Sequence, residues 1–590
     1  MVRTRSAAAL LAAAVLVSCG ADNTGRRTPP AAMAGGHPSP NAISEDEWFV
    51  DRAKEVGLDF THDNGMSGKF YFPEVMAPGA ALVDYDNDDD LDVYLVQGQL
   101  LGRGIGDHVP PPRQASLPPR GRLYRNDLAV AADGTRTFRF TDVTEPSGIT
   151  ASDYGMGVAV GDFNNDSWID LYLTGLNRNQ LWRNNGDGTF TDVSKATGTE
   201  DQGWSVSASF LDYDRDEWLD LYVGHYVEYS LEKDRRCTNV AGERSYCPPR
   251  VYEGQPGRLY RNQQDGTFTD VTEAALGGRR PTRTLGVIAA DFDNDGWIDL
   301  YVANDGEENQ LWMNQRNGTF KDTALVSGVA LTAEGQAEAS MGVDAGDFDN
   351  DGDDDLLVTT LTGEGSNLFI NNGSAAFEDQ SARSGINALS RENTGFGTAW
   401  IDFDNDSWLD VLSVSGLVQA PEGQANLPFP LGQRRQLFRN LRNGRFEEVT
   451  DRAGATFELS EVGRGAAFGD VDNDGDVDVL VSNDAGPTRL LINQIGSRNH
   501  WLGVRLVGAN ASRDMLGARV TVFRADGSTF HRRVRTDGSY ASAHDSRVVV
   551  GLGNSANDPR VQIRWPSGRT EEWLEVAIDR YTTLKEGSGR

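Results

Sequence analysis

The sequence predicts an all-β protein, in which a seven-bladed β-propeller is followed by a small C-terminal β domain. Three observations support this prediction: seven copies of an Asp-rich nonapeptide, a Leu-x-x-Asn segment and turn after each copy, and a composition typical of short strands. The 590 residues include 66 Gly, 12 Trp, 16 Tyr and 24 Phe, which favour many turns and strands. A chain of this length needs more than one small core.

The N-terminal residues are typical of a protein that a bacterial cell exports. Two arginines precede an apolar run at 7–17, which is about half a membrane span and therefore fits the core of a signal peptide. The next residues, Leu16-Val17-Ser18-Cys19, resemble a lipobox, in which the cysteine is lipidated; an ordinary secretory signal is the alternative. We expect residues 1–18 to be a lipoprotein signal peptide, Cys19 to carry the lipid, and residues 19–45 to be a flexible tether.

The two remaining cysteines, Cys237 and Cys247, lie close together in the sequence. In an exported chain such a pair suggests a disulfide, which would close a loop of about ten residues and contribute about 2–3 kcal/mol. Two free thiols are the alternative. A metal site is disfavoured because there is no Cys-x-x-Cys spacing and no histidine nearby.

The nonapeptide Asp-x-[Asp/Asn]-x-Asp-x-x-x-Asp defines a repeating unit. Each copy is followed by a Leu-x-x-Asn segment, such as Leu181–Asn184, and then by a turn and another strand, as in residues 185–193. Asn-Gly and Asp-Gly between apolar alternations are strong hairpin signals. About four short strands per unit, with about 50 to 80 residues between successive copies, favour a β-propeller over residues 46–496.

The ring is predicted to close through the N-terminal strand. Residues 49–58 resemble the part of a repeat found at 140–149, whereas the last repeat lacks such a strand after Asn493. Pairing of the N-terminal strand with the last blade would remove a free sheet edge.

The acidic loops are predicted to bind calcium, with up to seven ions per chain. Ca²⁺ takes six to eight oxygen ligands, and carboxylates at positions 1, 3 and 5 of a tight loop, with Asp at position 9, can surround one ion. The predicted ligands are Asp84, Asp86, Asp88 and Asp92; Asp162, Asn164, Asp166 and Asp170; Asp212, Asp214, Asp216 and Asp220; Asp291, Asp293, Asp295 and Asp299; Asp347, Asp349, Asp351 and Asp355; Asp402, Asp404, Asp406 and Asp410; and Asp470, Asp472, Asp474 and Asp478.

Two other interpretations of the loops are less satisfactory. An EF-hand needs Glu at position 12 and flanking helices, but position 12 is Leu95 in the first copy and Val302 in the fourth. Solvated acidic turns would leave many like charges within nine residues without a counterion. The third copy is expected to be the weakest site, because Arg215 replaces the usual Asn at position 4.

The net charge of the chain, −33, resides in these loops. The seven nonapeptides together carry −32, and all other residues together carry −1. Phosphate binding depends on clustered Lys and Arg, so no nucleic-acid partner is expected. That exclusion is weaker than the total charge suggests, because the surface away from the loops is close to neutral. A chain with 38% hydrophobic residues can still bury a core.

The loops and their Gly-Thr-Phe hairpins resemble the FG-GAP/VCBS repeats of integrin-α-type propellers. Residues 497–590 are richer in Arg, and the segments at 510–520, 538–540, 551–553 and 565–568 are similar to the ASPIC/UnbV domain. The combination is that of the cartilage acidic protein family, here as a bacterial lipoprotein member. The resemblance implies structural metal loops on one propeller face, ligands on the other, and no settled activity.

The favoured function is that of an extracytoplasmic Ca²⁺-binding module for adhesion or recognition. It would be lipid-anchored at the outer membrane or cell surface, with secretion as the alternative, and its partner would be an unidentified extracellular protein or glycan. Three long spacers, 97–122, 225–258 and 416–436, should emerge on the face away from the ions. They are mildly basic and could contact an anionic partner, with Arg103, Arg113, Arg120, Arg122, Arg235, Arg236, Arg434 and Arg435 among their residues.

A calcium-dependent lyase or hydrolase acting on polysaccharide is the alternative function. It would need a metal loop with an open ligand position and a nearby base. His544-Asp545-Ser546 has the residue types of a catalytic triad, but adjacency in sequence does not place the side chains together, and a turn is the better interpretation. No catalytic residue is therefore predicted.

Overall fold

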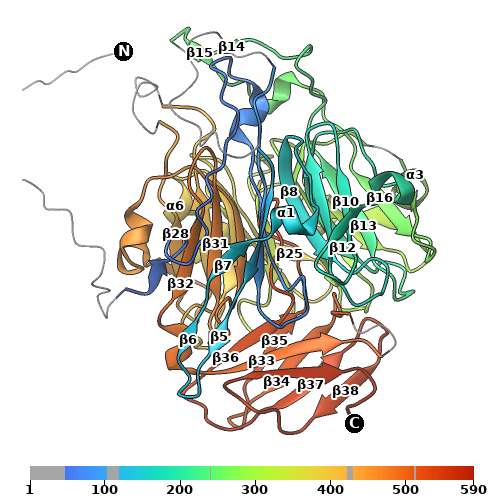
Figure 1. The fold of residues 1–590 in the computed structure, drawn as a ribbon, viewed down its shortest axis with the longest axis vertical. Coiled ribbons are helices and arrows are strands. Elements are labelled where there is room, and N and C mark those ends of the chain that lie inside the picture. Colours follow the sequence, from blue (N-terminus) through green and yellow to red (C-terminus); the bar gives the residue numbers. More distant parts are fainter. Residues whose placement is uncertain (1–46, 103–118, 240, 279, 422–429, 510–512) are drawn as a thin grey trace, which may run out of the picture. The chain divides into compact units, whose positions relative to one another are not determined.

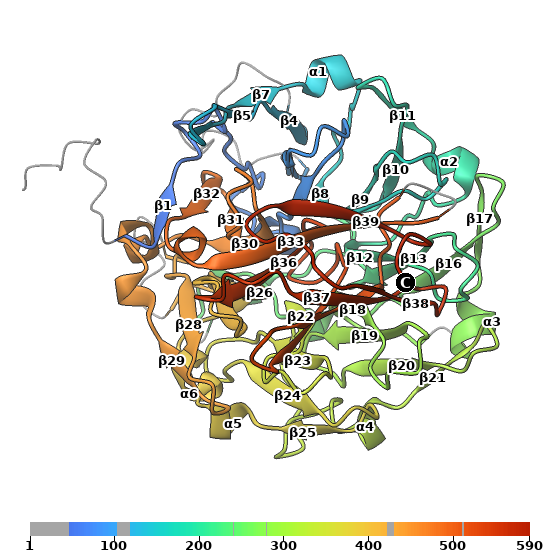
Figure 2. The ribbon, with the colours of Figure 1, turned by 90° about the horizontal axis from the view of Figure 1, so that it is seen from below.

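The computed structural model describes residues 47–102, 119–239, 241–278, 280–421, 430–509 and 513–590. Seven four-stranded antiparallel sheets follow one another between residues 49 and 493 of this described part, and we number them blades 1 to 7. They are arranged around a common centre (Figure 2). The predicted all-β propeller class is confirmed.

Each blade contains four strands, which follow one another in sequence order in blades 1 to 6. Blades 1 to 4 consist of β2 (Ala80–Val83), β3 (Asp92–Leu95), β4 (Arg122–Asn126) and β7 (Phe140–Asp142); β8 (Gly155–Gly161), β9 (Asp170–Gly175), β10 (Gln180–Asn184) and β11 (Phe190–Asp192); β12 (Ser205–Leu211), β13 (Asp220–His225), β16 (Arg258–Asn262) and β17 (Phe268–Asp270); and β18 (Thr284–Ala290), β19 (Asp299–Asn304), β20 (Gln310–Asn314) and β21 (Phe320–Asp322).

Blades 5 to 7 follow the same plan. They consist of β22 (Val343–Gly346), β23 (Asp355–Val358), β24 (Asn367–Asn371) and β25 (Phe377–Asp379); β26 (Gly395–Ile401), β27 (Asp410–Ser415), β28 (Gln436–Asn440) and β29 (Phe446–Glu448); and β30 (Gly463–Gly469), β31 (Asp478–Asn483), β32 (Arg489–Asn493) and β1 (Phe49–Asp51). Short helices cover the outer edges: α1 (Thr144–Ser147), α2 (Ser194–Thr197), α3 (Thr272–Leu276), α4 (Ala324–Ser327), α5 (Ser381–Ser384) and α6 (Ile386–Ser390).

The N-terminal strand completes the last blade, as the sequence predicts. Strand β1 pairs antiparallel with β32, with Phe49 opposite Asn493. The described start and end of the propeller are thereby joined in one sheet. This pairing covers the edge of β32.

The Asn of each Leu-x-x-Asn segment joins neighbouring blades. Its side-chain Nδ2 donates to the backbone carbonyl at loop position 2 of the preceding blade, at 2.7–3.0 Å in all seven cases. Asn126 of blade 1 donates to Val471 of blade 7, so this series of hydrogen bonds closes around the ring. The second sequence motif therefore links adjacent blades in addition to ending a strand.

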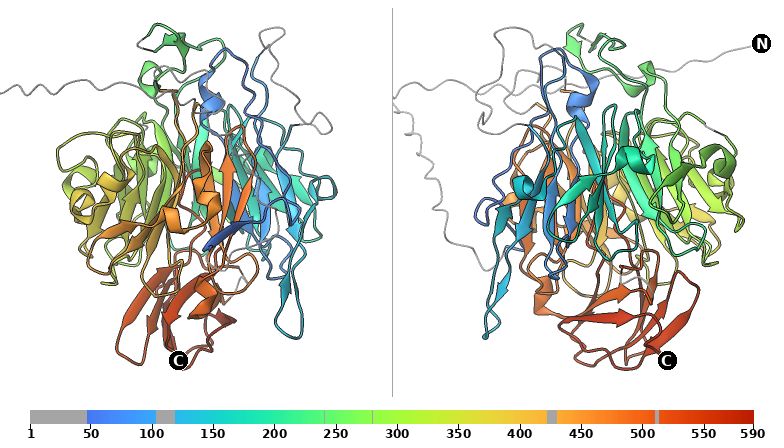
Figure 3. Two further views of the ribbon diagram at one scale, coloured as in Figure 1. Left: turned by 90° about the vertical axis from the view of Figure 1, so that its left-hand side faces the viewer. Right: turned by 45° about the vertical axis from the view of Figure 1, so that its right-hand side comes forward.

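The C-terminal residues form two further sheets on one side of the propeller (Figures 1 and 3). One contains β36 (Val548–Gly553), β33 (His500–Val507) and β39 (Tyr581–Lys585); the other contains β35 (Thr529–Arg533), β34 (Arg519–Phe523), β37 (Arg560–Arg564) and β38 (Thr570–Trp573). Their apolar core is continuous with that between blades 2 and 3, where Leu219 and Leu516 belong to one cluster. Residues 497–590 are thus packed against the propeller, although the sequence suggests a separate domain.

The segment between β35 and β36, residues 534–547, enters the centre of the propeller, and we call it the central segment. Ala543 forms a parallel bridge with Ala81, and Ser539 forms an antiparallel bridge with Val343. The Tyr540 hydroxyl donates to the carbonyl of Met76 at 2.7 Å. A Cβ on Gly79 would lie 1.7 Å from the carbonyl oxygen of Ala541, so the close approach requires glycine there. The inner strands thus surround this segment.

The link between blades can be tested at Asn184, whose Nδ2 donates to the carbonyls of Tyr85 and Ile169 at 2.7 and 3.2 Å. Asn184→Ala should lower the free energy of unfolding by about 1–3 kcal/mol, because buried carbonyls lose their donor. The neighbouring Asn185 is exposed, so Asn185→Ala should cost less than about 0.5 kcal/mol. Denaturant unfolding of both variants checks this, and equal losses would contradict the role of Asn184.

Candidate metal centres

Each acidic loop connects the first and second strands of a blade and is closed by its own carboxylates. The position-1 carboxylate accepts the backbone N–H groups of positions 5 and 6 at 2.7–3.2 Å in all seven loops. The position-9 carboxylate begins the second strand and accepts the backbone N–H of the Leu-x-x-Asn asparagine at 2.7–2.8 Å. The repeated Asp residues therefore shape the loop.

Two loop positions adopt left-handed backbone conformations, which explains their residue types. Position 6 has a positive φ in every loop, from 68° at Glu217 to 102° at Gly352, in line with the Gly found there in three copies. Position 4 also has a positive φ, and Asn tolerates this conformation best among non-glycine residues. This requirement at position 4 was not predicted from the sequence.

Arg215 meets the same backbone requirement, with a φ of 61°. Its guanidinium lies 5.2 Å from the ring centre of Trp297, and its Nε donates to the carbonyl of Pro566 at 3.0 Å. Asp212, Asp214 and Asp220 still bring one oxygen each to within 4.8 Å of one another. The side chain of Arg215 is therefore engaged by the next blade and the C-terminal domain. Weak cation binding by the third loop stays a prediction.

Carboxylate oxygens gather at the predicted positions and could hold metal ions. Groups of three within 4.8 Å of one another occur in the loops of blades 1, 3, 4, 5 and 6. They are Asp84, Asp86 and Asp92; Asp212, Asp214 and Asp220; Asp291, Asp293 and Asp295; Asp347, Asp349 and Asp351; and Asp402, Asp404 and Asp410. In the second loop, the Asn164 amide instead donates to Asp166 at 2.8 Å.

Several of these oxygens are buried without a hydrogen-bond partner among the described residues. At position 3 they are Oδ1 of Asp86, Asp214, Asp404 and Asp472. At position 9, Oδ2 of Asp410 is also buried without a hydrogen-bond partner. A buried carboxylate oxygen without a donor is costly, and a cation would satisfy all members of such a group at once. The residues present thus fit a bound cation.

Burial and like charge shift the pKa values of the loop carboxyls upward. Burial, followed by the neighbouring carboxylates, raises the pKa of Asp402 and of Asp470 to about 8. Burial raises the pKa of Asp84 and of Asp347 to about 7. Without a cation, the loops can therefore retain protons near neutral pH.

The C-terminal domain supplies arginines to this acidic face. Residues 497–590 contain fifteen Lys and Arg against ten Asp and Glu. Four of the arginines donate to position-6 carbonyls: Arg513 to Glu217 at 2.8 Å, Arg519 to Gly352, Arg532 to Ser407 at 3.1 Å, and Arg547 to Asp89 at 3.1 Å. This excess of Arg was the available sequence signal, but sequence does not reveal which loop each one reaches.

Three position-1 carboxylates also contact this domain. Arg564 forms an ion pair with Asp291, Arg505 lies 3.6 Å from Asp84, and the Tyr581 hydroxyl donates to Asp470 at 2.8 Å. The C-terminal domain therefore packs on the face that carries the acidic loops and covers them in part, leaving Asp88, Asp166 and Asp351 at position 5 exposed. The loops do not form an open surface for a large ligand.

The His544-Asp545-Ser546 sequence is not a catalytic triad. His544 Nδ1 accepts the backbone N–H of Phe468, Asp545 pairs with Arg547 at 2.9 Å, and the Ser546 hydroxyl donates to Asp514 at 2.7 Å. The three side chains have separate partners, so the interpretation as a structural turn is favoured.

The second of the predicted insertions lies on the opposite face. Within the second insertion, β14 (Cys237–Thr238) and β15 (Arg244–Ser245) lie at the end of the propeller away from β33 to β38 (Figure 1). Cys237 and Cys247 form the predicted disulfide, with Cα atoms 5.1 Å apart. Cys19 and the predicted signal and tether lie outside the described residues. Among the residues that the structure describes, no helix is long and apolar enough to cross a membrane.

The fold and the loops together define an all-β propeller whose acidic loops could hold metal ions. A family model for FG-GAP-like repeats matches residues 162–223, 251–302, 291–358 and 432–481. A family model for ASPIC and UnbV matches residues 508–590. The chain therefore carries FG-GAP-like repeats followed by an ASPIC/UnbV domain, and both parts of the predicted resemblance are confirmed.

Curated relatives carry the name Cartilage acidic protein 1. The relative from Xenopus tropicalis is 28% identical over 306 residues, which are 50% of this chain and 44% of the relative. The Mus musculus relative is 27% identical over 308 residues, again 50% and 44% of the two chains. The matched region thus covers less than half the length of these relatives.

Solved structures show only distant similarity. A lectin from Agrocybe aegerita that recognises non-reducing terminal N-acetylglucosamine is 15% identical, with 64% of this chain and 90% of that chain covered and a TM-score of 0.35. YCF48 bound to D1 peptide is 9% identical, with 71% and 92% covered and a TM-score of 0.37.

The raised pKa values predict opposite pH responses with and without metal. A carboxyl whose pKa is raised in the folded state stabilises the fold below its unfolded value of about 4, and this stabilisation is lost as pH rises through the folded value. For Asp402 and Asp470 that window extends to about pH 8. Metal-stripped protein should therefore lose at least about 5 °C in melting temperature between pH 5.5 and 8.5.

Protein saturated with Ca²⁺ should not show this loss, because the ion favours the charged carboxylates. Differential scanning calorimetry of both forms across this pH range is the measurement. Parallel curves for stripped and calcium-treated protein would contradict the assignment of the loops as cation sites.

Proposed function

We propose that the protein is an extracytoplasmic Ca²⁺-binding β-propeller that acts as a binding or adhesion module at the cell envelope. The observation that carries the proposal is the repeated cluster of buried carboxylates without hydrogen-bond donors, seen most clearly at Asp86, Asp214, Asp404 and Asp472. Calcium is favoured over zinc and copper because all the candidate ligands are oxygens, and over magnesium because each loop offers four side chains whereas magnesium usually binds through one or two carboxylates. It would supply the positive charge that the loops lack.

The ligands in each loop are those predicted from the sequence, at positions 1, 3, 5 and 9. Positions 1 and 9 already accept backbone N–H groups, so they hold the loop in shape before an ion arrives. In the loops of blades 1, 3, 6 and 7, position 3 offers a carboxylate oxygen without a hydrogen-bond donor. Removing the ion should therefore loosen the face on which the C-terminal domain rests, because its arginines donate to the same loops.

The face with the insertions is the better candidate for a partner. The C-terminal domain partly covers the acidic loops, whereas the disulfide-bonded insertion extends from the other end of the propeller (Figures 1 and 3). Within this insertion Arg235 and Arg236 are both exposed. An anionic glycan or an acidic protein surface would complement them.

The other arginines named in the insertions are less accessible to an anionic partner. Arg435 is 3% exposed and pairs with Glu461 at 2.7 Å, and Arg434 pairs with Asp451 at 2.7 Å. Arg120 is buried against Glu145, and Arg122 is buried with Asp142 at 4.0 Å. Arg103 and Arg113 lie outside the described residues. The hypothesis of a basic partner-binding surface therefore narrows to Arg235 and Arg236.

The location at the envelope follows from the lipobox-like segment around Cys19, with Cys19 as the proposed anchor and the tether at 19–45 as the spacer. The relatives named Cartilage acidic protein 1 favour an extracellular role. A polysaccharide-cleaving activity has less support, because the acidic loops lie beneath the C-terminal domain and His544, Asp545 and Ser546 do not cooperate.

A screen of immobilised glycans and matrix proteins tests this function. Calcium-loaded protein should retain an acidic ligand, and Arg235→Gln/Arg236→Gln should bind it at least about tenfold more weakly, because both charges are lost. Arg183→Gln/Lys195→Gln, which removes two charges from the outer part of blade 2, is the matched control and should bind normally.

The same samples are assayed for reducing ends. Their accumulation over time would favour the enzyme and contradict the binding module. Undiminished binding by the Arg235/Arg236 variant would reject the insertion as the contact surface.

A further inference from the structure

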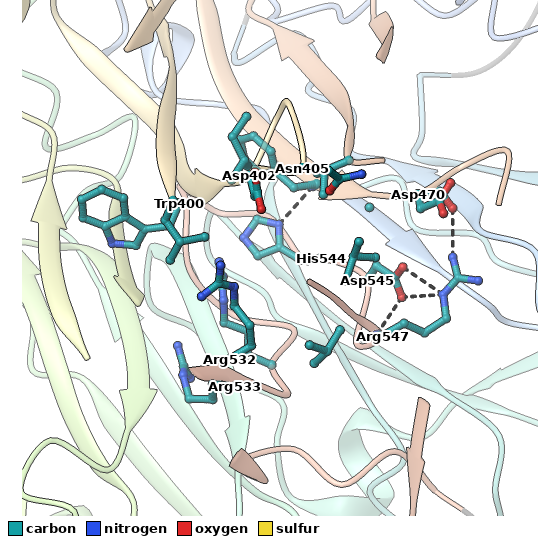
Figure 4. Close-up of a pocket in the computed structure, with 17 residues that line it drawn as sticks. Trp400, Asp402, Asn405, Asp470, Arg532, Arg533, His544, Asp545 and Arg547 are labelled. Atoms are coloured by element: carbon teal, nitrogen blue, oxygen red, sulfur yellow. Dashed lines mark hydrogen bonds and ion pairs between the residues drawn. The ribbon is translucent and has the colours of Figure 1, made fainter. Parts of the chain in front are cut away.

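A cavity of about 120 Å³ lies between blades 6 and 7 and the C-terminal domain. One water needs only about 10–15 Å³ of such space, so the cavity has room for a group of several heavy atoms. The side chains that line it include Asp402, Asn405, Asp470, Arg532, Arg533 and His544 (Figure 4).

His544 presents an unused donor to this cavity. Its Nδ1 accepts the backbone N–H of Phe468 at 3.2 Å, so the ring proton resides on Nε2. The residue is 3% exposed, yet Nε2 has no hydrogen-bond partner among the described residues. A buried N–H group without an acceptor is unfavourable, and a ligand with acceptor oxygens would satisfy it.

The arginines of the cavity supply further donors. Nε and Nη2 of Arg533 are buried and make no hydrogen bond among the described residues, although Asp354 lies 4.0 Å from its Nε and Asp537 lies 3.4 Å from its Nη1. Arg535 and Arg547 pair with Asp344 and Asp545 at 2.6 and 2.9 Å.

Arg532 differs from these three arginines in its partners. It donates to the carbonyls of His531 and Ser407, at 2.8 and 3.1 Å. No ion pair of this guanidinium is present among the described residues, but the charges of Asp402 and Asp347 act on it. Once cations neutralise these carboxylates, the guanidinium charge is left without a counter-charge. A small anion is the ligand that would complement both this charge and the unused N–H donors.

We propose that this cavity binds a small oxyanion of the sulfate or phosphate type, held by His544, Arg532 and Arg533. The proposal rests on the proposed function in one respect, because Asp402 and Asp470 line the same cavity. Calcium in the loops of blades 6 and 7 neutralises these carboxylates and leaves the cavity positive. Anion binding is therefore coupled to occupation of the two loops.

The cavity is small and lies between the propeller and the C-terminal domain, so a free ion is a better ligand than a group attached to a large molecule. Its walls come from the propeller on one side and from the C-terminal domain on the other, including the end of the central segment at His544. An anion bound there contacts both parts and stabilises their association. Calcium and the anion thus act together at the covered face.

Isothermal titration of sodium sulfate into the calcium-loaded full chain, with chloride at matched ionic strength as the reference, tests the proposal. Saturable binding of about one sulfate per chain is expected. Arg532→Gln should weaken it at least about tenfold, and Arg532→Lys should restore part of the affinity because it retains the charge. Arg533→Gln serves as a second variant if Arg532→Gln does not fold.

Arg519→Gln is the matched control, because Arg519 also donates from the C-terminal domain to a position-6 carbonyl, that of Gly352, but does not line the cavity. It should bind sulfate as the wild type does. Equal binding by wild type, Arg532→Gln and Arg533→Gln would overturn the site.

Calcium titrations on the same samples separate this inference from the proposed function. Calcium binding without saturable sulfate binding means that the cavity holds water only, which overturns the inference and leaves the function standing. Absence of calcium binding overturns the function. Sulfate binding that is equally tight after chelation overturns the proposed coupling.

Discussion

The mutual repulsion of carboxylates packed into seven short loops is the constraint on which the rest of this structure depends. Each loop uses its position-1 and position-9 Asp to hold its own backbone, and this places further carboxylates close together. The fold supplies two kinds of compensation. Backbone N–H groups satisfy the anchoring oxygens, and arginines of the C-terminal domain reach the loop carbonyls and several position-1 carboxylates. In four of the loops an oxygen at position 3 remains without a donor, and a bound cation would satisfy it.

The repeated motifs made much of the propeller predictable. Strands begin at the position-9 Asp, the Leu-x-x-Asn segments form the third strands, and Phe49 pairs with Asn493 to complete the last blade. These features depend on local spacing, which a sequence displays directly. The hydrogen bond from Asn126 to Val471 and the bridge from Ala543 to Ala81 join residues hundreds of positions apart. The Asn segments recur in the sequence, but the blade that each Asn contacts is not visible there. The bridge at Ala543 belongs to no repeat, so the central segment was not predicted. Arg435 appeared to be a surface charge, but the fold buries it against Glu461.

The two ends of the propeller have different physical roles in this account. The acidic end carries the loops, the arginines and the oxyanion cavity, and the C-terminal domain covers it in part. The other end carries the disulfide-bonded insertion with exposed Arg235 and Arg236. Metal occupancy therefore acts on stability and domain association at one end, while partner recognition is assigned to the other. The central segment joins them, because Tyr540 extends from the C-terminal domain to Met76.

The number of calcium ions retained per chain tests the central claim most directly. Native mass spectrometry of the folded protein, after exchange into buffer with trace calcium, should show several bound ions and at most seven. Asp404→Ala should retain one ion fewer, because it removes a buried position-3 ligand, whereas Asp187→Ala, in an exposed hairpin, should retain the wild-type number. A folded wild-type chain that retains no calcium, or an Asp404→Ala chain that retains the full number, would contradict the account.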